Sequence, residues 1–452
     1  STMHSFFKLP FYPLLPDDPN LSLQRGRIHE FFKYTKPHRK LLEQIELVII
    51  DEISMVRADI IDAIDRILRV YSHNLREPFG GKQLLLVGDV FQLEPVVKND
   101  EREILNRFYP TPYFFSARVF GQIDLVSIEL QKVYRQTDPV FVGVLDHIRT
   151  NTAGAADLQL LNTRYGSQIE ESEADMYITL ATRRDTVDSI NEKKLAELPG
   201  ESITFEGVIE GDFPESSLPT SQELVLKPGA QIIFIKNDFD RRWVNGTIGV
   251  IAGIDEEEET IYVITDDGKE CDVKRDSWRN IRYRYNEKTK EIEEEVLGSF
   301  TQYPIRLAWA ITVHKSQGLT FSRVVIDFTG GVFAGGQAYV ALSRCTSLDG
   351  IQLKKPINRA DIFVRPEIVN FAGRFNNRQA IDKALKQAQA DVQYAAAARA
   401  FNKGDMEECL EQFFRAIHSR YDIEKPVPRR LIRRKLGIIN TLKEQNKKLK
   451  EQ

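Results

Sequence analysis

The sequence predicts an α/β protein with two parallel-sheet cores, an inserted all-β module and a C-terminal helical module. Short apolar runs alternate with helical patterns in the first third of the chain and again in two later stretches. Between those stretches the chain changes to short strands with Gly and Asp turns. After about Pro366 it becomes rich in Ala, Gln and Lys and has a helical pattern.

Length and composition fit a folded protein of two to four domains. The 452 residues are 42% hydrophobic and 28% charged. No apolar run approaches the ~18 residues of a membrane span, and no signal peptide is recognisable. The three cysteines, Cys271, Cys345 and Cys409, are too far apart in sequence to indicate a disulfide framework or a zinc site. We therefore expect an intracellular protein with no membrane contact. Its net charge of −4 requires any nucleic-acid contact to come from local basic surfaces.

Three buried strands are predicted in the first third. They are "ELVIID" (46–51), "KQLLLVGD" (82–89) and "DLVSIEL" (124–130). Between the first two, "DIIDAIDRILRVY" (59–71) has apolar residues at helical spacing. Continuous apolar strands separated by helices are typical of a parallel sheet covered on both faces.

A second α/β block begins at "MYITLATRRDTVDSINEKKLAEL" (176–198) with a strand, a basic turn and a helix. It resumes at "PIRLAWAITVHKSQG" (304–318), "RVVIDF" (323–328) and "AYVALSRC" (338–345). In between, residues 223–300 contain short strands such as "GTIGVIAGI" and "ETIYVITDDGKECDV", which predict a small antiparallel barrel.

Residues 390–418 predict an antiparallel helix pair around Lys403, Gly404 and Asp405. One such pair cannot bury its own face. We therefore expect it to pack on the core or on a neighbouring repeat, or to present a face to a protein partner.

Polar residues follow two of the predicted strands at the ligand edge of an open α/β sheet. Asp51 is placed to hold Mg²⁺, and Glu52 to polarise a water for attack on a γ-phosphate. The alternative is a strand end carrying two solvated acids. Gly88 and Asp89 end the next strand, and Gln92 follows where an amide senses a terminal phosphate. Two polar strand tips facing one crevice favour a nucleotide site.

Three further motifs carry candidate residues, each with a simpler alternative. Arg135 in "VYRQTD" is placed to stabilise a γ-phosphate, or it is a surface arginine in an interdomain link. His314 and Lys315 precede Gln317 in "ITVHKSQGLTF", a cluster that by itself is commonly just surface. Arg344 in "YVALSRCTS" is either a catalytic cation or a salt-bridged helical arginine.

Together these motifs resemble a known family. Asp51-Glu52, "GDVFQLEPV", "YRQ", "ATRR", "VHKSQG" and "ALSRC" occur in the order found in superfamily 1 helicases. The closest match is the PIF (petite integration frequency) branch, which is related to RecD. "PFGGKQLLLVGD" resembles the end of a segment peculiar to that branch, and "TMHSFFKL" resembles its early DNA-contacting motif. The resemblance covers about residues 1–365 and says little about the remainder.

The resemblance implies a domain plan. Residues 1–130 would form a first, incomplete RecA-like core with a wedge-like insertion at about 8–40, although "LPFYPLLPDDPN" also fits a Pro-rich surface loop. Residues 131–222 and 301–365 would form the second RecA-like core. Residues 223–300 would form a Src-homology-3-like barrel over single-stranded DNA, with "KRDSWRNIRYRY" supplying cations and aromatic rings. Residues 366–452 would form a tetratricopeptide-like helical extension.

The resemblance also assigns roles to residues. Glu52 would be the hydrolytic base, Asp51 the Mg²⁺ ligand, and Gln92 the residue that couples the phosphate state to the DNA track. Arg135 and Arg344 would complete the site from the second core, and Gln317 and Gly318 would contact ATP. The implied DNA-binding residues are His4, Phe6, Pro95, Val96, Thr182, Arg183, Thr312, His314 and Lys315.

One expected motif is missing from the sequence. The family's Walker A loop, G-x-x-x-x-G-K-[ST], would precede "TMHSFF". "PFGGKQ" lacks the earlier glycine and the Ser or Thr after Lys, and "GGVFAGGQ" has no lysine. We expect that the sequence lacks its natural N-terminus, rather than being a degenerate homologue. Residues 1–452 alone should then hydrolyse ATP too slowly to be useful.

The function implied is an ATP- and Mg²⁺-dependent DNA helicase that moves 5′ to 3′ on single-stranded DNA and acts in replication, repair and recombination. Duplex or structured DNA junctions would be partners, and we expect a monomer. It would be cytoplasmic (nucleoid) if bacterial, and nuclear or mitochondrial if eukaryotic. Two alternatives are a non-catalytic protein that binds single-stranded nucleic acid and an RNA-directed superfamily 1 helicase. "PFGGKQLLLVGD" and "HKSQG" disfavour the RNA-directed enzyme.

Overall fold

A computed structural model describes residues 2–10, 12–23, 27–167, 176–286 and 291–420, and scattered positions between 434 and 448. The chain divides into two compact units. The first comprises residues 1–124 and 131–372, and the second comprises residues 125–130 and 373–452. Phe11 of the predicted wedge, the side chains of 283–285 and most of the C-terminal "LKEQNKKLKEQ" lie outside the described residues.

The first core is built on a parallel strand pair, as predicted. β1 (Leu47–Ile50) pairs with β2 (Gln83–Leu86) in register from Leu47 opposite Gln83 to Ile50 opposite Leu86. The expectation that both sheet faces are covered is wrong for the described residues. Leu47, Ile49, Leu85 and Val87 are exposed because no described element packs over them. The helices of this core are α1 (Met3–Phe7), α2 (Arg27–Phe32), α3 (Lys36–Gln44), α4 (Ala58–Tyr71) and α5 (Asn99–Leu105).

The third predicted strand of this core, residues 124–130, is not a strand. A β-ladder needs a neighbouring strand to receive its backbone hydrogen bonds. Asn376 contacts this segment: its N–H donates to the Ser127 carbonyl, and its side chain accepts from the Glu129 N–H, both at 3.0 Å. Leu130 is 90% exposed. The apolar run is present, but no described strand pairs with it.

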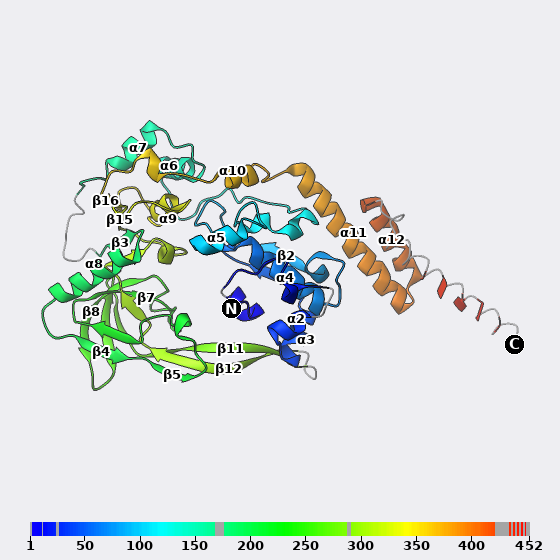
Figure 1. Cartoon of the computed structure of the whole chain (residues 1–452), viewed down its shortest axis with the longest axis horizontal. Helices are drawn as coiled ribbons and strands as arrows, with labels where there is room; N and C mark the ends of the chain where they lie inside the picture. The colour runs from blue at the N-terminus through cyan, green and yellow to red at the C-terminus, as the bar shows by residue number, and fades with distance from the viewer. Residues whose placement is uncertain are drawn as a thin grey trace. The chain divides into compact units, whose positions relative to one another are not determined.

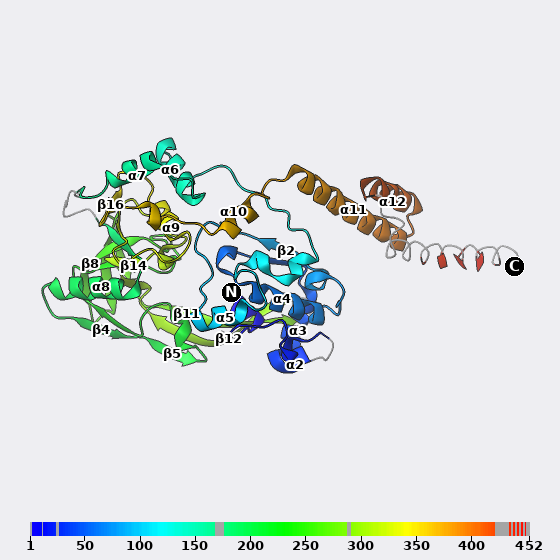
Figure 2. The same ribbon diagram turned by 45° about the horizontal axis from the view of Figure 1, so that its top comes forward.

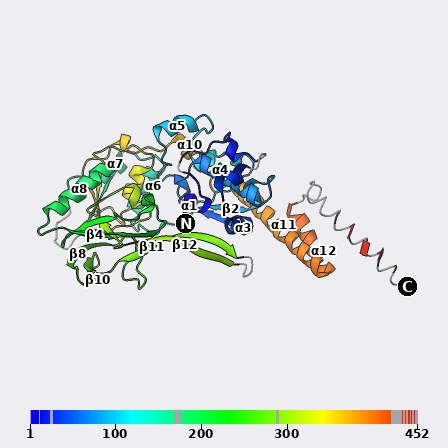
Figure 3. The same ribbon diagram turned by 60° about the horizontal axis from the view of Figure 1, so that its bottom comes forward.

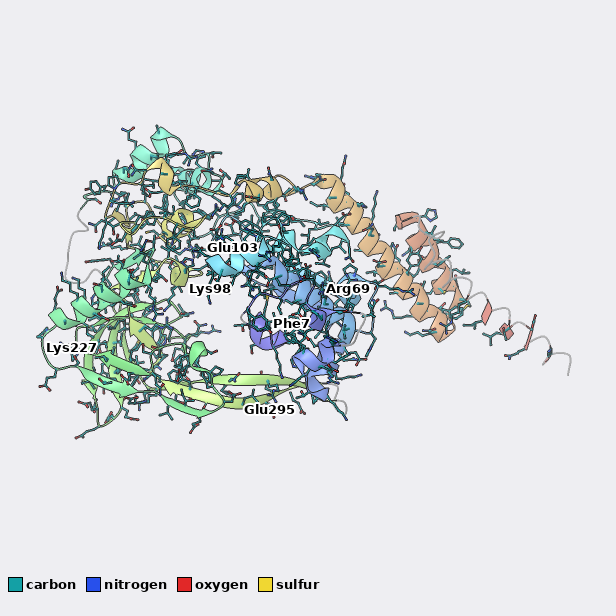
Figure 4. All side chains as sticks on the ribbon, viewed as in Figure 1. Phe7, Arg69, Lys98, Glu103, Lys227 and Glu295 are labelled. Carbon is teal, nitrogen blue, oxygen red and sulfur yellow. The ribbon has the colours of Figure 1, made fainter. Side chains whose placement is uncertain are left out.

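Helix α4 forms where the helical spacing predicts it, and its aspartates are buried. Asp59, Asp62 and Asp65 recur every three residues and so lie along one side of the helix. Arg69, which is labelled in Figure 4, pairs with Asp65 at 2.9 Å. Each carboxylate also satisfies the backbone of a different loop, because buried N–H groups need acceptors. In order, they accept from Leu14 at 2.9 Å, Val119 at 3.0 Å and Phe79 at 2.6 Å.

The second core is a four-stranded, fully parallel sheet in the order β14-β3-β15-β16, which confirms the predicted parallel block. The register sets Thr312 and Asp327 beside Ala181, so three strands end at one sheet edge. The strands are β3 (Ile178–Ala181), β14 (Ala310–Thr312), β15 (Val324–Asp327) and β16 (Ile351–Leu353). The helices are α6 (Pro139–Arg149), α7 (Ala155–Asn162), α8 (Arg184–Glu197) and α9 (Gln337–Ser343).

The inserted β-rich region runs from Ile203 to Leu307, beyond the predicted 223–300 at both ends. Its largest sheet has the order β10-β9-β8-β7-β13, and two smaller sheets pair β11-β12-β5 and β4-β6. Closure into a Src-homology-3-like barrel stays a prediction. The strands are β4 (Ile203–Glu206), β5 (Val208–Gly211), β6 (Glu223–Leu226), β7 (Gln231–Phe234), β8 (Ile248–Asp255), β9 (Thr260–Thr265), β10 (Glu270–Val273), β11 (Asp276–Asn286), β12 (Glu291–Gln302) and β13 (Ile305–Leu307).

A long hairpin extends from this region to the first core. Strands β11 and β12 pair in antiparallel fashion with a register shift between Asn280 and Ile281. Arg282 faces Glu295 across the pair at 3.7 Å. Glu295 is labelled in Figure 4. Strand β11 lies against α3, and Figures 1 and 3 show the far end of the hairpin beside that helix. The inserted region thus touches the end of the segment predicted as a wedge.

The second unit contains the predicted helix pair. Helices α11 (Arg378–Lys403) and α12 (Met406–Arg420) pack together as an antiparallel pair (Figure 2). Gly404 ends α11 with φ +84°, a backbone conformation that glycine favours. Tyr394 and Phe413 contact between the helices at 5.9 Å. A further helix, α10 (Pro366–Ala372), belongs to the first unit. Across the described residues, no helix combines the length and apolarity needed to cross a bilayer.

Candidate nucleotide and nucleic-acid site

The tips of β1 and β2 form the first half of the site. Exposed Asp51 follows β1, and its carboxylate accepts the Glu52 N–H at 2.9 Å. Gly88 follows β2 and lies against the backbone of Ile53. A side chain at this position would place its Cβ 2.9 Å from the Ile53 nitrogen. Glycine at this position therefore lets the two polar strand tips lie side by side.

A loop from the second core, residues 317–320, completes the site. Gln317 lies between two first-core side chains that the sequence also singles out. Its Nε2 donates to Glu52 Oε2 at 2.9 Å and lies 3.2 Å from Gln92 Oε1. The structure therefore brings the predicted base, the predicted sensor and a predicted ATP-contacting residue into one hydrogen-bonded group. Gly318 follows with φ +79° and open space around it.

The two predicted arginines lie beside this loop. Arg135 donates to Thr320 Oγ1 at 2.9 Å and to the Ser343 carbonyl at 3.2 Å. Arg344 is only 2% exposed and donates to the carbonyls of Val340 and Leu319 and to Ser343 Oγ, at 3.1–3.3 Å. No carboxylate among the described residues forms an ion pair with either arginine. Neither arginine is therefore ion-paired in the described structure, and their catalytic roles stay a prediction.

The electrostatics of the arginines favour an anion. Burial, followed by the nearby charge of Arg135, lowers the pKa of Arg344 to about 10. Burial also lowers the pKa of Arg135. Two guanidinium groups held by carbonyls and hydroxyls, without a carboxylate, would gain interaction energy from a phosphate placed between the cores.

The environment of Glu52 suits a base. Burial raises the pKa of Glu52, and the neighbouring Asp51 charge raises it further. The hydrogen bond from Gln317 and the charge of Arg344 act in the opposite direction. A half-buried carboxylate with a raised pKa is a better proton acceptor than an exposed one.

Several contacts of this site were not predicted from the sequence. Gln136 donates to the carbonyls of Ser343 and Cys345 at 3.0 and 2.8 Å, and so fixes the backbone around Arg344. Its position directly after Arg135 in "YRQ" is the feature of the sequence that could have predicted a role for it. Asp89 pairs with Arg149 at 3.3 Å. Nothing in the sequence links these two residues, because the link depends on packing.

A basic edge of the second core holds five of the predicted DNA-binding residues. Thr312 Oγ1 accepts the Lys315 N–H at 3.2 Å, and Arg183 Nε donates to the Gly330 carbonyl at 3.1 Å. Burial lowers the pKa of His314. Thr182 is buried, and its hydroxyl has no hydrogen-bond partner within the described parts of the chain. These side chains come from the carboxyl ends of neighbouring strands, where ligands of open sheets bind.

Arg184 and Arg306 also lie at this edge, although neither was predicted to bind DNA. Burial, and then the charges of Arg306 and Arg184, lower the pKa of Lys315. Burial and the charge of Arg184 lower the pKa of Arg306. The cations therefore repel one another, and a phosphate backbone would relieve that repulsion.

The remaining predicted DNA-binding residues lie in the first core. His4 and Phe6 are half-buried in α1, and the Phe6 ring packs on Phe7 at 4.9 Å. Pro95 is buried, whereas Val96 is 66% exposed. Of this group, Val96 offers the most open apolar surface. The DNA-binding role of all four residues stays a prediction.

The residues fit a magnesium nucleotide. Asp51 is an exposed carboxylate at a strand end, and two arginines that form no ion pair with a described carboxylate contact loop 317–320. No cluster of three His, Cys, Asp or Glu side chains suited to a metal occurs in the described portion of the chain. A Mg²⁺ ion here would take one or two protein carboxylates and complete its shell with phosphates and water.

Two α/β cores that meet across a nucleotide site define a motor ATPase of the helicase class. Comparison with known proteins gives the family. The PIF1-like helicase family model matches residues 1–143. The "ATP-dependent DNA helicase Pif1" of Campylobacter jejuni subsp. jejuni serotype O:2 is 33% identical over 366 residues, which cover 78% of each chain. The chain belongs to the PIF1-like helicase family.

Solved structures agree with this assignment. Bacteroides sp. Pif1 in complex with ADP-AlF4 superposes with a TM-score of 0.73 at 40% identity, covering 82% of each chain. Bacteroides Pif1 bound to single-stranded DNA gives 0.59 at 40% identity, covering 82% of this chain and 83% of that one. The chain spans about half the length of the mammalian relatives that it matches, such as 45% of human PIF1 at 35% identity.

Proposed function

We propose that the protein is an ATP-dependent DNA helicase that translocates 5′ to 3′ on single-stranded DNA. The observation that carries the proposal is Gln317, which joins Glu52 and Gln92 beside two arginines without carboxylate partners. Relatives named ATP-dependent DNA helicase Pif1 support the reaction. The names of the relatives do not give the polarity, which rests on the family resemblance.

The chain's own residues divide the work between the two cores. Bound Mg²⁺ would neutralise phosphate charge, with Asp51 as its protein ligand. Glu52 would take the proton of the attacking water, and the hydrogen bond from Gln317 would orient the Glu52 carboxylate. Arg135 and Arg344 would exchange carbonyl partners for phosphate oxygens as the cores close. Closure thereby depends on the phosphate and ends after hydrolysis.

Single-stranded DNA would bind along the basic edge of the second core and α1. Arg183, Lys315, Arg184 and Arg306 would follow phosphates, and Val96 would meet bases. A relative has been solved bound to single-stranded DNA, and its lower TM-score at equal identity indicates a different arrangement of parts. We infer that strand binding rearranges the domains.

Binding of single-stranded DNA should depend steeply on salt. Three to five neutralised phosphates, at a slope of about −0.7 each, predict a roughly 15- to 130-fold loss of affinity between 50 and 200 mM salt. Part of the affinity should survive high salt, because stacking releases no counterions. The measurement is fluorescence anisotropy with labelled oligonucleotides, and it needs no ATP.

The matching variant replaces His314 and Lys315 by alanine. Binding should weaken about equally for all base sequences, because phosphate contacts carry no sequence information. Lys193→Ala with Lys194→Ala on α8 removes two exposed lysines that are not proposed to bind DNA and serves as the control. Equal affinity for blunt duplex and single strand would contradict the proposed track.

ATP turnover has to be measured in a form in which a Walker A loop precedes residue 1, since residues 1–452 contain none. We call it the loop-bearing form. In this form, the raised pKa of Glu52 should set the acid limb of kcat against pH above the range of an ordinary glutamate, because the base must be deprotonated. Gln317→Ala removes a hydrogen bond that lowers this pKa, so the limb should move to higher pH.

The control for this pH profile is Glu52→Gln, whose residual rate should show no such limb. A Gln317→Ala profile that differs from wild type only in height would contradict the role assigned to this hydrogen bond.

Strand displacement by the loop-bearing form on matched DNA and RNA duplexes tests the function itself. Displacement of DNA with a 5′ single-stranded tail supports the proposal. Displacement only from a 3′ tail overturns the polarity, and preference for RNA favours the RNA-directed alternative. Single-strand binding without ATP turnover favours the non-catalytic one. We further propose that α11 and α12 form an accessory module that binds a protein partner, and that the protein is a monomer. Its proposed location is the nucleoid in a bacterium, or the nucleus or mitochondrion in a eukaryote.

A further inference from the structure

Three residues of one four-residue loop, 317–320, contact the proposed catalytic groups. Gln317 contacts Glu52, the Leu319 carbonyl accepts from Arg344, and the Thr320 hydroxyl accepts from Arg135. A small displacement of this loop would therefore move the base and both cations at once. The residues that pack against this loop therefore determine the geometry of the whole site.

The inserted β-rich region packs against this loop. The turn between β7 and β8 places Gly246 directly on the Leu319 side chain. A Cβ on Gly246 would lie 2.9 Å from Leu319 Cδ2, closer than van der Waals contact allows. Gly246 has φ +99°, and its N–H donates to the Phe234 carbonyl at 2.8 Å, which fixes the turn. A side chain at this position would be strained by the positive φ and would require Leu319 to shift.

The turn itself is anchored to the second core. Ile233 of β7 and Ile248 of β8 are buried in the same hydrophobic cluster as Val340 and Leu342 of α9. Leu319 packs against that cluster. The inserted region, the loop and the helix before Arg344 thus share one packed core, and such cores transmit displacements instead of absorbing them.

We propose that the contact between Gly246 and Leu319 positions loop 317–320 and makes ATP turnover depend on the placement of the inserted β-rich region. Gly246 and Leu319 are then positioning residues for the nucleotide site. The proposal rests on the proposed function. The same region also carries the β11–β12 hairpin that contacts α3. Single-stranded DNA bound to this region would therefore change the positions of Glu52 and Arg344 through the contact between Gly246 and Leu319.

The test is Gly246→Ala in the loop-bearing form. The added methyl group should displace Leu319 and lower DNA-stimulated kcat by about 10- to 100-fold, the cost of a misplacement of about 1 Å. The KM for ATP and single-strand affinity should change less than threefold. Gly268→Ala is the matched control, because Gly268 has φ +79° but nothing within 4 Å of its Cβ position. It incurs similar backbone strain without the contact.

A double-mutant cycle separates contact from strain. Leu319→Ala alone should lower kcat by loosening the loop, and Leu319→Met should restore most of it. The pair Gly246→Ala with Leu319→Ala should lose less than the product of the single losses, because the clashing atom is gone. The control is Leu160→Ala. Leu160 is a half-buried leucine of α7 that packs against the same cluster, and its substitution should leave kcat near the wild-type value.

Two outcomes overturn the proposal. In one, Gly246→Ala behaves like Gly268→Ala, because Leu319 turns aside without moving the loop. In the other, the double variant shows the full product of the single losses. If Gly246→Ala does not fold, the comparison of Leu319→Ala with Leu160→Ala decides, and equal kcat values reject the proposal. A wild-type loop-bearing form without ATP turnover would reject the proposed function, and with it the premise of this inference.

Discussion

Replacing Arg344 by alanine in the loop-bearing form is expected to lower kcat for ATP hydrolysis by about 10³- to 10⁵-fold, the usual contribution of an arginine that neutralises transition-state charge. The side chain is buried, has no carboxylate partner among the described residues, and binds only carbonyls and one hydroxyl. Single-strand affinity should stay within a few-fold, because Arg344 is not on the proposed DNA track. The measurement is steady-state ATPase with saturating single-stranded DNA.

The control for Arg344 is Arg164→Ala. Arg164 also donates to backbone carbonyls, those of Ile351 and Asp349, but it lies outside the nucleotide site. It separates the loss of arginine–carbonyl hydrogen bonds from the loss of a catalytic charge. Arg344→Lys keeps the charge but not the forked geometry, so we expect partial activity at most. A rate close to wild type for Arg344→Ala would reduce Arg344 to a structural residue of its helix.

The second large effect is expected for Glu52→Gln. Loss of the base should lower kcat by roughly 10²- to 10⁴-fold while nucleotide and DNA binding persist. The substitution keeps the size of the side chain and an oxygen able to accept from Gln317, so the loop should stay in place. The expected phenotype is a protein that binds both ligands and does not turn over.

The matched carboxylate is Glu101, which is half-buried on α5 and pairs with Arg57 at 3.4 Å. Glu101→Gln should leave kcat within about twofold, since its contacts with Arg57 and with the Lys98 N–H lie outside the nucleotide site. An equal loss in both variants would point to a general effect of neutralising acidic residues. Unchanged turnover in Glu52→Gln would require a different base.

Local patterns in the sequence determined the parts of this protein that depend on neighbours along the chain. Apolar runs followed by Asp51-Glu52 and Gly88-Asp89 predicted parallel strands with polar tips, and both form. Helical spacing predicted α4, and Gly404 marked the turn between the last two helices. The type of a helix or strand is indicated by the spacing of apolar residues over a short stretch, so a single sequence predicts it without comparison to relatives.

The same patterns misjudged features that depend on a partner. Residues 124–130 were predicted as a buried strand, but no strand in the described part of the chain pairs with them, and a strand needs a neighbour for its backbone hydrogen bonds. Helical spacing predicted α4 but not the burial of Asp59, Asp62 and Asp65, whose oxygens accept hydrogen bonds from loops elsewhere in the chain. In both cases the outcome depended on what lay opposite.

Only the tertiary structure decided how the site is joined. Motif order named Glu52, Gln92, Arg135, Gln317 and Arg344 as candidates, but not which of them touch. Gln317 and Glu52 are 265 residues apart and meet because two separately folded sheets present their loops to one crevice. The contact between Gly246 and Leu319 is equally invisible in sequence, since a glycine there records a close approach without naming its neighbour. Local sequence sets what each segment can form, and packing between distant segments sets which side chains act together.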